Sequence, residues 1–211
     1  MKISRTLAIA ATSGLLLTAV PLAAHAQDVS RTGSYTVARG KTISGDLTVR
    51  NGTVRIYGTV EGDVRQIGKG SVVVHRSGEV DGNVTESGTG GVSIYGEVDG
   101  NVTESGKGSV RVYRHGSVDG NVSERSKGDV RVDRGGEVDG NVTERHAGRV
   151  IVRGSVDGNV DEHGSGHVYL HSTAEVDGNV TERKAGNVYR YRKADIDGSV
   201  RETGKGRLVR R

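Results

Sequence analysis

Acidic and amide side chains recur at fixed places along the chain, and they are the first candidates for chemistry. They belong to a seven-residue motif, V-D-G-N-V-T-E, which occurs in full at residues 80–86, 98–104, 138–144 and 176–182. Carboxylate and amide oxygens are ligands that Ca²⁺ accepts, so stacked copies of the motif would make a candidate calcium site. The candidate ligands are Asp81, Asp99, Asp119, Asp139, Asp157 and Asp177, with Asn83, Asn101, Asn121, Asn141, Asn159 and Asn179.

The same Asp and Asn rows also fit a structural role without metal. The glycine-rich nonapeptide of calcium-binding solenoids is absent from the sequence. We therefore favour solvated aspartates beside asparagines that form hydrogen-bonded ladders along the turns. Like charges stacked at strand spacing repel one another, so the aspartates then need counterions or must splay apart. On this interpretation the protein has no cofactor, and Ca²⁺ on the Asp and Asn rows is the alternative.

A second group of residues mixes cations with aromatic rings in the later part of each repeat. Its members are His75, Tyr95, Arg111, Tyr113, Arg131, Arg153, Tyr169, His171, Tyr189 and Tyr191. Ring stacking and charge would allow such a stripe to bind a glycan or an anionic polymer. The residues that we assign to this candidate binding surface, the Arg/Tyr face, are Tyr95, Arg111, Tyr113, Arg131, Tyr169 and Tyr189. Ordinary aromatic packing between neighbouring strands predicts the same pattern, and we favour it.

Motifs for catalysis are absent from the sequence. The chain has no cysteine, which excludes thiolate nucleophiles, disulfides and thiolate zinc sites, and neither Gly-x-Ser-x-Gly nor His-Glu-x-x-His occurs. The repeats also vary too little in length to supply the long loops that build a polysaccharide-cutting cleft. We predict a protein that is not an enzyme and has no catalytic or metal-binding residues; a lyase is the least favoured alternative.

Nine copies of the motif, complete or degenerate, organise the chain. They begin at residues 43, 60, 80, 98, 118, 138, 156, 176 and 196, so successive copies are 17, 20, 18, 20, 20, 18, 20 and 20 residues apart. Every spacing after the first is even, and an even insertion keeps each side chain on its own face of an extended strand. Apolar residues or glycine alternate with polar residues through each unit. This pattern predicts two strand segments per repeat and no helix after the N-terminal stretch.

The odd first interval contains a slip of one residue in this alternation. Leu47 and Val49 have odd numbers, whereas the corresponding apolar residues Val54 and Ile56 have even numbers. We expect Asn51-Gly52 to absorb the slip as a bulge or turn.

A glutamate stands at an inward-facing position of nearly every repeat. The set is Glu86, Glu104, Glu124, Glu144, Glu162, Glu182 and Glu202. Each precedes a turn rich in glycine or serine, so we expect these side chains at a corner rather than in the core. Arg76, Arg114 and Arg134 also have inward parity in the longer repeats, which would allow an ion-pair network with these glutamates at the corner. Such a network would be costly if buried and worth little if exposed.

The composition restricts the core to small aliphatic residues. The 211 residues include 34 glycines but no Phe, Trp or Cys, and the single proline and single methionine fall before residue 27. A single coil of such residues buries too little surface to offset the entropy of ordering it, so coils must stack. The absence of proline fits the continuous hydrogen-bond ladders of a stack.

These features predict an all-β, single-domain parallel β-solenoid of about nine coils of 18–20 residues. An antiparallel hairpin array or barrel shows the same alternation and is the alternative. Inward glycines such as Gly82 are expected to let opposite walls of a coil approach. The predicted boundaries are a signal peptide at 1–26, an N-terminal cap at 27–42, solenoid repeats at 43–203, and a half-coil or basic C-terminal tail at 204–211.

The N-terminal stretch has the three parts of a secretory signal. Lys2 and Arg5 precede an apolar run over residues 7–20, and Ala24-His25-Ala26 matches a small-x-small cleavage site. We expect a mature chain without a membrane span, exported to the periplasm or exterior of a bacterium; an uncleaved membrane anchor is the alternative. Because 30 Lys and Arg nearly balance 26 Asp and Glu, we expect no nucleic-acid partner.

Two early runs and the repeats that follow them carry a family resemblance. The runs are I-S-G-D-L-T-V at 43–49 and G-T-V-E-G-D-V at 58–64, and copies of G-x-V-x-G-N-V follow. They resemble the bactofilins, bacterial proteins that polymerise into filaments without nucleotide. The resemblance covers nearly all of residues 43–203, and it implies a right-handed, triangular β-helix that associates end to end.

The expected function is that of an exported, non-enzymatic scaffold at the cell envelope whose partner is a second copy of itself. The expected end contacts are Ile43, Leu47, Leu208 and Val209. The alternative is a monomeric, adhesin-like module at the surface or in the periplasm. Such a module would recognise cell-wall or anionic polysaccharide through the Arg/Tyr face.

Overall fold

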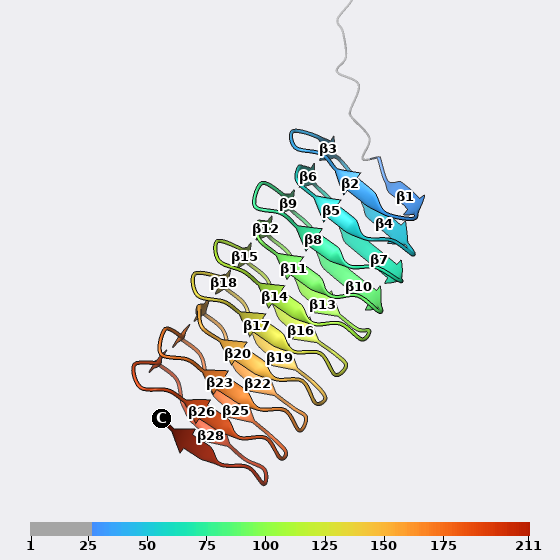
Figure 1. Cartoon of the computed structure of the whole chain (residues 1–211). Coiled ribbons are helices and arrows are strands. Elements are labelled where there is room, and N and C mark those ends of the chain that lie inside the picture. Colours follow the sequence, from blue (N-terminus) through green and yellow to red (C-terminus); the bar gives the residue numbers. More distant parts are fainter. Residues whose placement is uncertain (1–26) are drawn as a thin grey trace, which may run out of the picture.

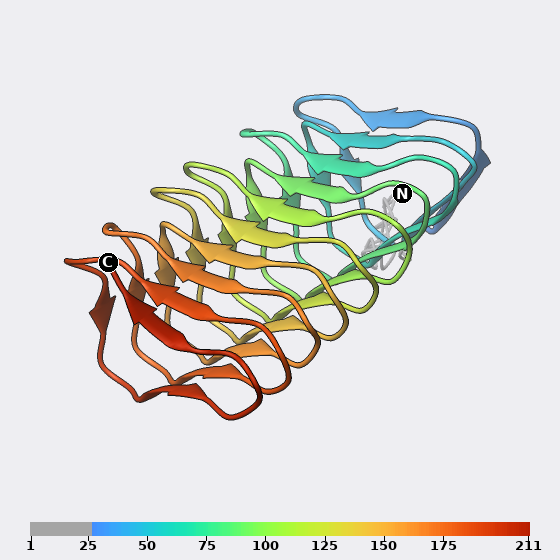
Figure 2. The same cartoon turned by 60° about the horizontal axis from the view of Figure 1, so that its bottom comes forward.

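The computed structural model describes residues 27–211, which form a single stack of parallel β-strand coils from β1 at one end to β29 at the other (Figure 1). The expected signal sequence at 1–26 lies outside the described residues. Within residues 27–211, the chain has no helix of the length and apolarity needed to cross a bilayer. Strands of successive coils lie one above another on each side of the stack (Figure 2). The parallel solenoid of about nine coils is therefore confirmed, and the antiparallel alternative is wrong.

Sheet A contains the strands that carry the second valine of the motif. It has 10 strands, β1 to β28, taken from every coil in order. They are β1 Val29–Thr32, β4 Leu47–Arg50, β7 Val64–Gly68, β10 Val84–Gly88, β13 Val102–Glu104, β16 Val122–Glu124, β19 Val142–Glu144, β22 Val160–Glu162, β25 Val180–Glu182 and β28 Val200–Glu202.

Sheet B contains the strands that follow the glycine-rich turn after sheet A. It also has 10 strands. They are β2 Tyr35–Val37, β5 Val54–Ile56, β8 Val72–Val74, β11 Val92–Ile94, β14 Val110–Val112, β17 Val130–Val132, β20 Val150–Val152, β23 Val168–Leu170, β26 Val188–Arg190 and β29 Leu208–Arg210.

Sheet C is the third side of the stack and was not expected from the repeat. Its 9 strands have two residues each, which is too short for an alternation to reveal. They are β3 Thr42–Ile43, β6 Thr59–Val60, β9 Glu79–Val80, β12 Glu97–Val98, β15 Ser117–Val118, β18 Glu137–Val138, β21 Ser155–Val156, β24 Glu175–Val176 and β27 Asp195–Ile196. Each coil thus has three strands, so the prediction of two is wrong.

Identical residues stack on one another because the strands pair in register. Val102 of β13 pairs with Val122 of β16, and Val110 of β14 pairs with Val130 of β17. The inward valines of a coil, such as Val98, Val102 and Val110, are 0% exposed and form one continuous core. Small aliphatic side chains fill the narrow interior, as the composition requires.

Both ends of the described chain belong to the solenoid. Residues 29–37, within the expected cap, form β1 and β2, which pair in parallel with β4 and β5. In the expected tail, Leu208–Arg210 forms β29, which pairs with β26. These end strands lack the V-D-G-N-V signature and stay in register with the strands that they cover, although β1 is mostly exposed, with Arg31 beside the buried Val49.

Glycine and asparagine adapt the backbone where the coils meet. Asn51 has a positive φ of 51°, which places the one-residue slip of the first interval in this turn. A Cβ at Gly82 would lie 2.6 Å from the carbonyl carbon of Gly62 in the preceding coil. The inward glycines therefore allow stacked coils to approach each other, and not opposite walls as expected.

The turns between sheets B and C explain why coils differ by two residues. A long turn such as His75–Gly78 joins β8 to β9, whereas only Tyr95 and Gly96 join β11 to β12. Where a coil with a short turn lies between coils with long turns, an open notch remains between the long turns at this corner. One such notch has a volume of about 950 Å³ and carries both signs of charge, with Arg114, Arg134 and Arg153 beside Glu137 and Glu175.

Candidate functional site

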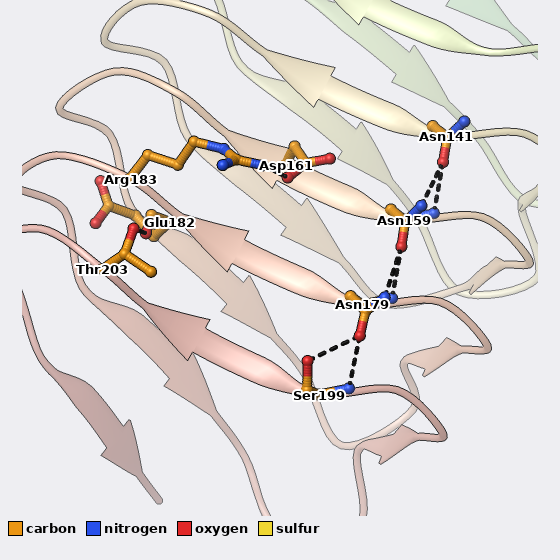
Figure 3. A network of polar contacts seen from close by, with 8 residues as sticks. All are labelled: Asn141, Asn159, Asp161, Asn179, Glu182, Arg183, Ser199 and Thr203. Atoms are coloured by element: carbon orange, nitrogen blue, oxygen red, sulfur yellow. Dashed lines mark hydrogen bonds and ion pairs between the residues drawn. The ribbon is translucent and has the colours of Figure 1, made fainter.

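The asparagine row forms a continuous hydrogen-bonded ladder along one corner of the stack. Asn121 donates from its backbone N–H and from Nδ2 to Asn101 Oδ1, both at 2.9 Å. The same two bonds recur from coil to coil through Asn141, Asn159 and Asn179 and end at Ser199 (Figure 3). Because each amide oxygen already accepts two hydrogen bonds, the ladder offers few free lone pairs to a cation.

Toward the N-terminal end of the ladder, aspartates occupy the positions that asparagines hold in the later coils. Asp63 Oδ1 accepts from the backbone N–H of Asn83 at 2.8 Å and from its Nδ2 at 3.0 Å. Asp46 Oδ1 and Asp28 Oδ1 each accept the backbone N–H of the aspartate in the following coil, at 2.9 Å. A carboxylate can accept these bonds but cannot donate, so the side-chain ladder begins at Asp63.

The aspartate row lies exposed on the turn beside the ladder. Partial burial and repulsion from Asp119 and Asp81 raise the pKa of Asp99, and burial with Asp119 and Asp157 does the same for the pKa of Asp139. Across residues 27–211, no group of three or more His, Asp or Glu side chains is arranged to hold a metal ion.

Aromatic rings in the sheet B strands and directly after them stack on one another between coils. The ring centroids of Tyr95 and Tyr113 are 3.9 Å apart, and those of Tyr169 and Tyr189 are 4.9 Å apart. Tyr57 and His75 continue the stacking toward the N-terminal end, at 3.8 Å. Cross-coil aromatic packing is thus present along the Arg/Tyr face.

The arginines of the Arg/Tyr face share a carboxylate that sequence reasoning missed. Asp133 lies 2.6 Å from Arg111 Nη2 and 2.5 Å from Arg131 Nε. Burial alone would raise the pKa of Asp133, but hydrogen bonds from Arg131 and Arg111 hold it below its ordinary value. The only sequence signal was an aspartate in a column otherwise occupied by rings and cations. The pairing offsets much of the positive charge that an anionic glycan would meet.

The glutamate row lies inside the solenoid, contrary to the expected corner network. Glu86, Glu104, Glu124, Glu144, Glu162 and Glu182 are each 0% exposed. Arg76, Arg114 and Arg134 lie exposed on the B–C turns, and within the described chain no ion pair joins them to these glutamates. The inward alternation therefore continues through the glutamate that follows each second valine of the motif, from β10 to β25.

The turn after sheet A supplies donors to these buried side chains. Glu104 Oε1 accepts the backbone N–H groups of Gly106 at 2.8 Å and Gly108 at 3.0 Å. The same i+2 and i+4 pattern recurs at Glu144, Glu162, Glu182 and Glu202. The glutamate thus fixes the tight turn that leads into sheet B, and alternation alone does not reveal this role.

The expected end residues differ in their access to a neighbouring chain. Leu47 is 0% exposed because β1 covers it, with Val29 as its register partner, so it is not an end residue. Ile43 lies in β3, the first strand of sheet C, and is 8% exposed. Leu208 is 37% exposed in β29, the last strand of sheet B, and Val209 lies beside it.

Among residues 27–211, the first and last coils present three open strand edges each. β1, β2 and β3 end the sheets on one side, and β28, β29 and β27 end them on the other. In the preceding coil, Val188 donates its N–H to the carbonyl of Arg207 at 3.0 Å. Leu208 holds the equivalent position in the last coil, so its N–H faces the space where a further coil would lie.

Comparison with known proteins agrees with this architecture. The family model for bactofilins, described as polymer-forming cytoskeletal, matches residues 35–126 and 105–201. The anti-sigma-W factor RsiW of Geobacillus kaustophilus is 43% identical over 58 residues, and the match spans only 28% of this chain and 28% of that protein. No solved structure matches. Since the two family matches together cover most of a chain that folds as one parallel solenoid, this protein belongs to the bactofilin family.

Proposed function

We propose that this protein is an exported scaffold whose solenoids join end to end into filaments at the cell envelope. The single observation that carries the proposal is the pair of open ends: no strand within residues 27–211 pairs with the three outer strand edges at either end of the stack. Open edges are templates for pairing with another chain, and soluble proteins normally cover them. The family's description as polymer-forming supports the same conclusion.

The C-terminal end combines an apolar patch with positive charge. Val200 and Leu208 are register neighbours of the buried Val180 and Val188, but no following coil covers them. A second chain would bury these side chains and continue the three ladders. The surrounding basic residues are Arg201, Lys205, Arg207, Arg210 and Arg211. Their repulsion opposes contact between two such ends and weakens as salt screens it.

Export and the lack of catalysis complete the proposal. Residues 1–26 have the sequence of a secretory signal, which supports a role for the protein outside the cytoplasm. The side chains that could do chemistry serve structure instead: asparagines in a ladder, rings in stacks and glutamates in turns. Mass spectrometry of the protein from its native cells tests export. Mature chains that begin at Gln27 in the envelope or medium support it, and cytoplasmic chains that keep residue 1 contradict it.

Substituting Leu208 tests end-to-end assembly. Leu208→Asp places a charge on the open edge of the last coil, and we expect sedimentable filaments to be lost. Val73→Asp is the matched control, because Val73 is a half-buried, outward residue of β8, whose coil has neighbours on both sides, and this variant should still assemble. Pelleting assays and electron microscopy measure the outcome. If both variants assemble as well as the wild type, this end does not form the contact.

A further inference from the structure

The fully buried glutamates form a row that no activity described above requires to be ionisable. We name it the glutamate column; its members are Glu86, Glu104, Glu124, Glu144, Glu162 and Glu182. We propose that the column is a proton-binding site, in which neighbouring carboxyl groups share protons along the axis of the solenoid. Protons taken from solvent then set how firmly the coils stack.

The register of sheet A places the carboxyl groups in a continuous line. Glu86 pairs with Glu104, Glu104 with Glu124, and this continues to Glu182. Parallel strands lie about 4.8 Å apart, so carboxyl groups on adjacent coils are direct neighbours along the stack. Hydrogen bonds between such neighbours are among the causes that raise the pKa of Glu86, Glu124 and Glu162. Gln66 of β7 occupies the same position before Glu86 and caps the N-terminal end of the line.

In each glutamate of the column, one carboxyl oxygen accepts hydrogen bonds and the other has no hydrogen-bond partner. Oε1 accepts backbone N–H groups of the following turn, as at Glu162, where Gly164 donates at 2.8 Å and Gly166 at 3.2 Å. Oε2 of all six glutamates is buried and has no hydrogen-bond partner, and the same is true of Gln66 Oε1. A buried acceptor without a donor is costly and rare in native proteins.

Protons on the Oε2 atoms would give every one of these oxygens a hydrogen-bond partner. A hydroxyl on Glu86 Oε2 would donate to Gln66 Oε1, which has no donor in the structure. The same step repeats along the column, with each protonated carboxyl donating to its neighbour on the preceding coil. The side-chain amide of Gln66 already donates to the carbonyls of Gly52 and Lys69, so only its oxygen is left to accept.

The surroundings of the column favour neutral carboxyl groups. The core residues that face it from sheets B and C are aliphatic. The charged groups that act on Glu86, Glu124 and Glu162 are their own column neighbours. Burial, followed by hydrogen bonds with adjacent glutamates, raises the pKa of Glu86 to about 7, of Glu124 to about 8 and of Glu162 to about 9. Six adjacent carboxylates without a cation would repel strongly in this environment.

A metal ion is the competing occupant of such a row. Cations need several oxygens around one point, whereas the column offers one free oxygen per coil. No group of three or more acidic or histidine side chains within residues 27–211 could hold a metal ion. A proton bridges two oxygens on adjacent coils, which is what the register supplies.

Proton binding makes stability depend on pH in a defined direction. Glutamate in the unfolded chain titrates near 4.5, whereas the pKa values of Glu86, Glu124 and Glu162 in the column are raised to about 7, 8 and 9. Below pH 4.5 the contribution of these three residues to stability is fully present. Between 4.5 and about 9 the folded chain holds more protons than the unfolded chain, so stability falls as the pH rises.

Infrared spectroscopy of the full chain counts the protonated carboxyl groups directly. The carbonyl stretch of protonated carboxylic acid should persist at neutral pH and disappear only as the pH passes about 9. Complete ionisation at pH 6 would overturn the proposal. The measurement concerns single solenoids as much as filaments, so its outcome does not depend on end-to-end assembly.

Glu124→Gln separates the column from other acidic groups. Glutamine is tolerated at this position in Gln66, donates a hydrogen bond and cannot ionise. We expect the alkaline fall in melting temperature to shrink by roughly a third, because Glu104 and Glu144 also lose a charged neighbour. Glu137→Gln is the matched control, because Glu137 is exposed and has Ser117 and Ser155 as register neighbours. This control should leave the pH dependence unchanged.

Two results of the melting series would contradict the proposal. The first is a Glu124→Gln chain whose melting temperature falls with pH as steeply as that of the wild type. The second is a wild-type chain whose alkaline stability is restored by Na⁺ or Ca²⁺, since a cation would then occupy the column. The infrared titration of the wild type remains decisive if Glu124→Gln does not fold.

Discussion

Single inward residues carry the stability of each coil. The alternation of the sequence predicts which ones, because strand side chains change face with every residue. Val122 illustrates this: it is 0% exposed, and its neighbours Asn121 and Ser123 point outward. The prediction succeeds since the same alternation repeats in nine copies of the motif.

A charge at Val122 should unfold the protein far more readily than a charge beside it. Val122→Asp buries a carboxylate among valines and should cost roughly 3–5 kcal/mol. Ser123→Asp is the control, because Ser123 lies on the outer face of the same strand, and it should change stability by about 0.5 kcal/mol or less. Urea denaturation followed by circular dichroism measures both. Equal losses would mean that the two faces are assigned wrongly.

Two residue-scale features could not be predicted, for the same physical reason. Burial of Glu104 depends on backbone donors at Gly106 and Gly108, which come together only when the turn has formed. Asp133 gains its role from Arg111, which lies on the preceding coil and 22 residues away in the sequence. The alternation of the sequence predicts which face of the strand a side chain occupies. It does not predict which hydrogen-bond or ion-pair partner that side chain meets.

At the scale of elements, ladders between coils hold the turns in register. The asparagine ladder satisfies backbone N–H groups at a corner where the sheets give no partner. The expectation that asparagines stack follows from the repeat alone. The alternation could not predict the third strand of each coil, because a two-residue strand such as Glu97–Val98 gains its identity only from pairing with the coils on either side. Only the family resemblance, which implies a triangular β-helix, pointed to a third side.

Removing one asparagine should weaken the ladder on both sides. Asn121→Ala deletes the acceptor for Asn141, at 2.8 and 2.9 Å, and the donor to Asn101. We expect a loss of about 1–2 kcal/mol in the free energy of unfolding. Asn121→Asp should lose less, because it keeps the acceptor, as Asp63 does for Asn83. Equal stability of Asn121→Ala and the wild type in urea would show that the ladder contributes nothing.

At the scale of the whole molecule, the solenoid is a rod whose sides are complete and whose ends are not. Along its sides, aromatic rings stack on the rings of adjacent coils, asparagines form hydrogen bonds to asparagines, and arginines pair with aspartates. Its ends leave strand edges and the apolar Leu208 uncovered. A rod of this kind gains most from a second copy of itself, which is why we place the function at the ends. A polysaccharide partner on the Arg/Tyr face is the alternative that assembly data would favour or exclude.

Negative-stain electron microscopy of the purified protein over a concentration series tests this account most directly. The account predicts long, unbranched filaments of uniform width that grow more numerous with concentration. Discrete short rods at every concentration would contradict it, and they would move attention from the ends of the solenoid to its Arg/Tyr face.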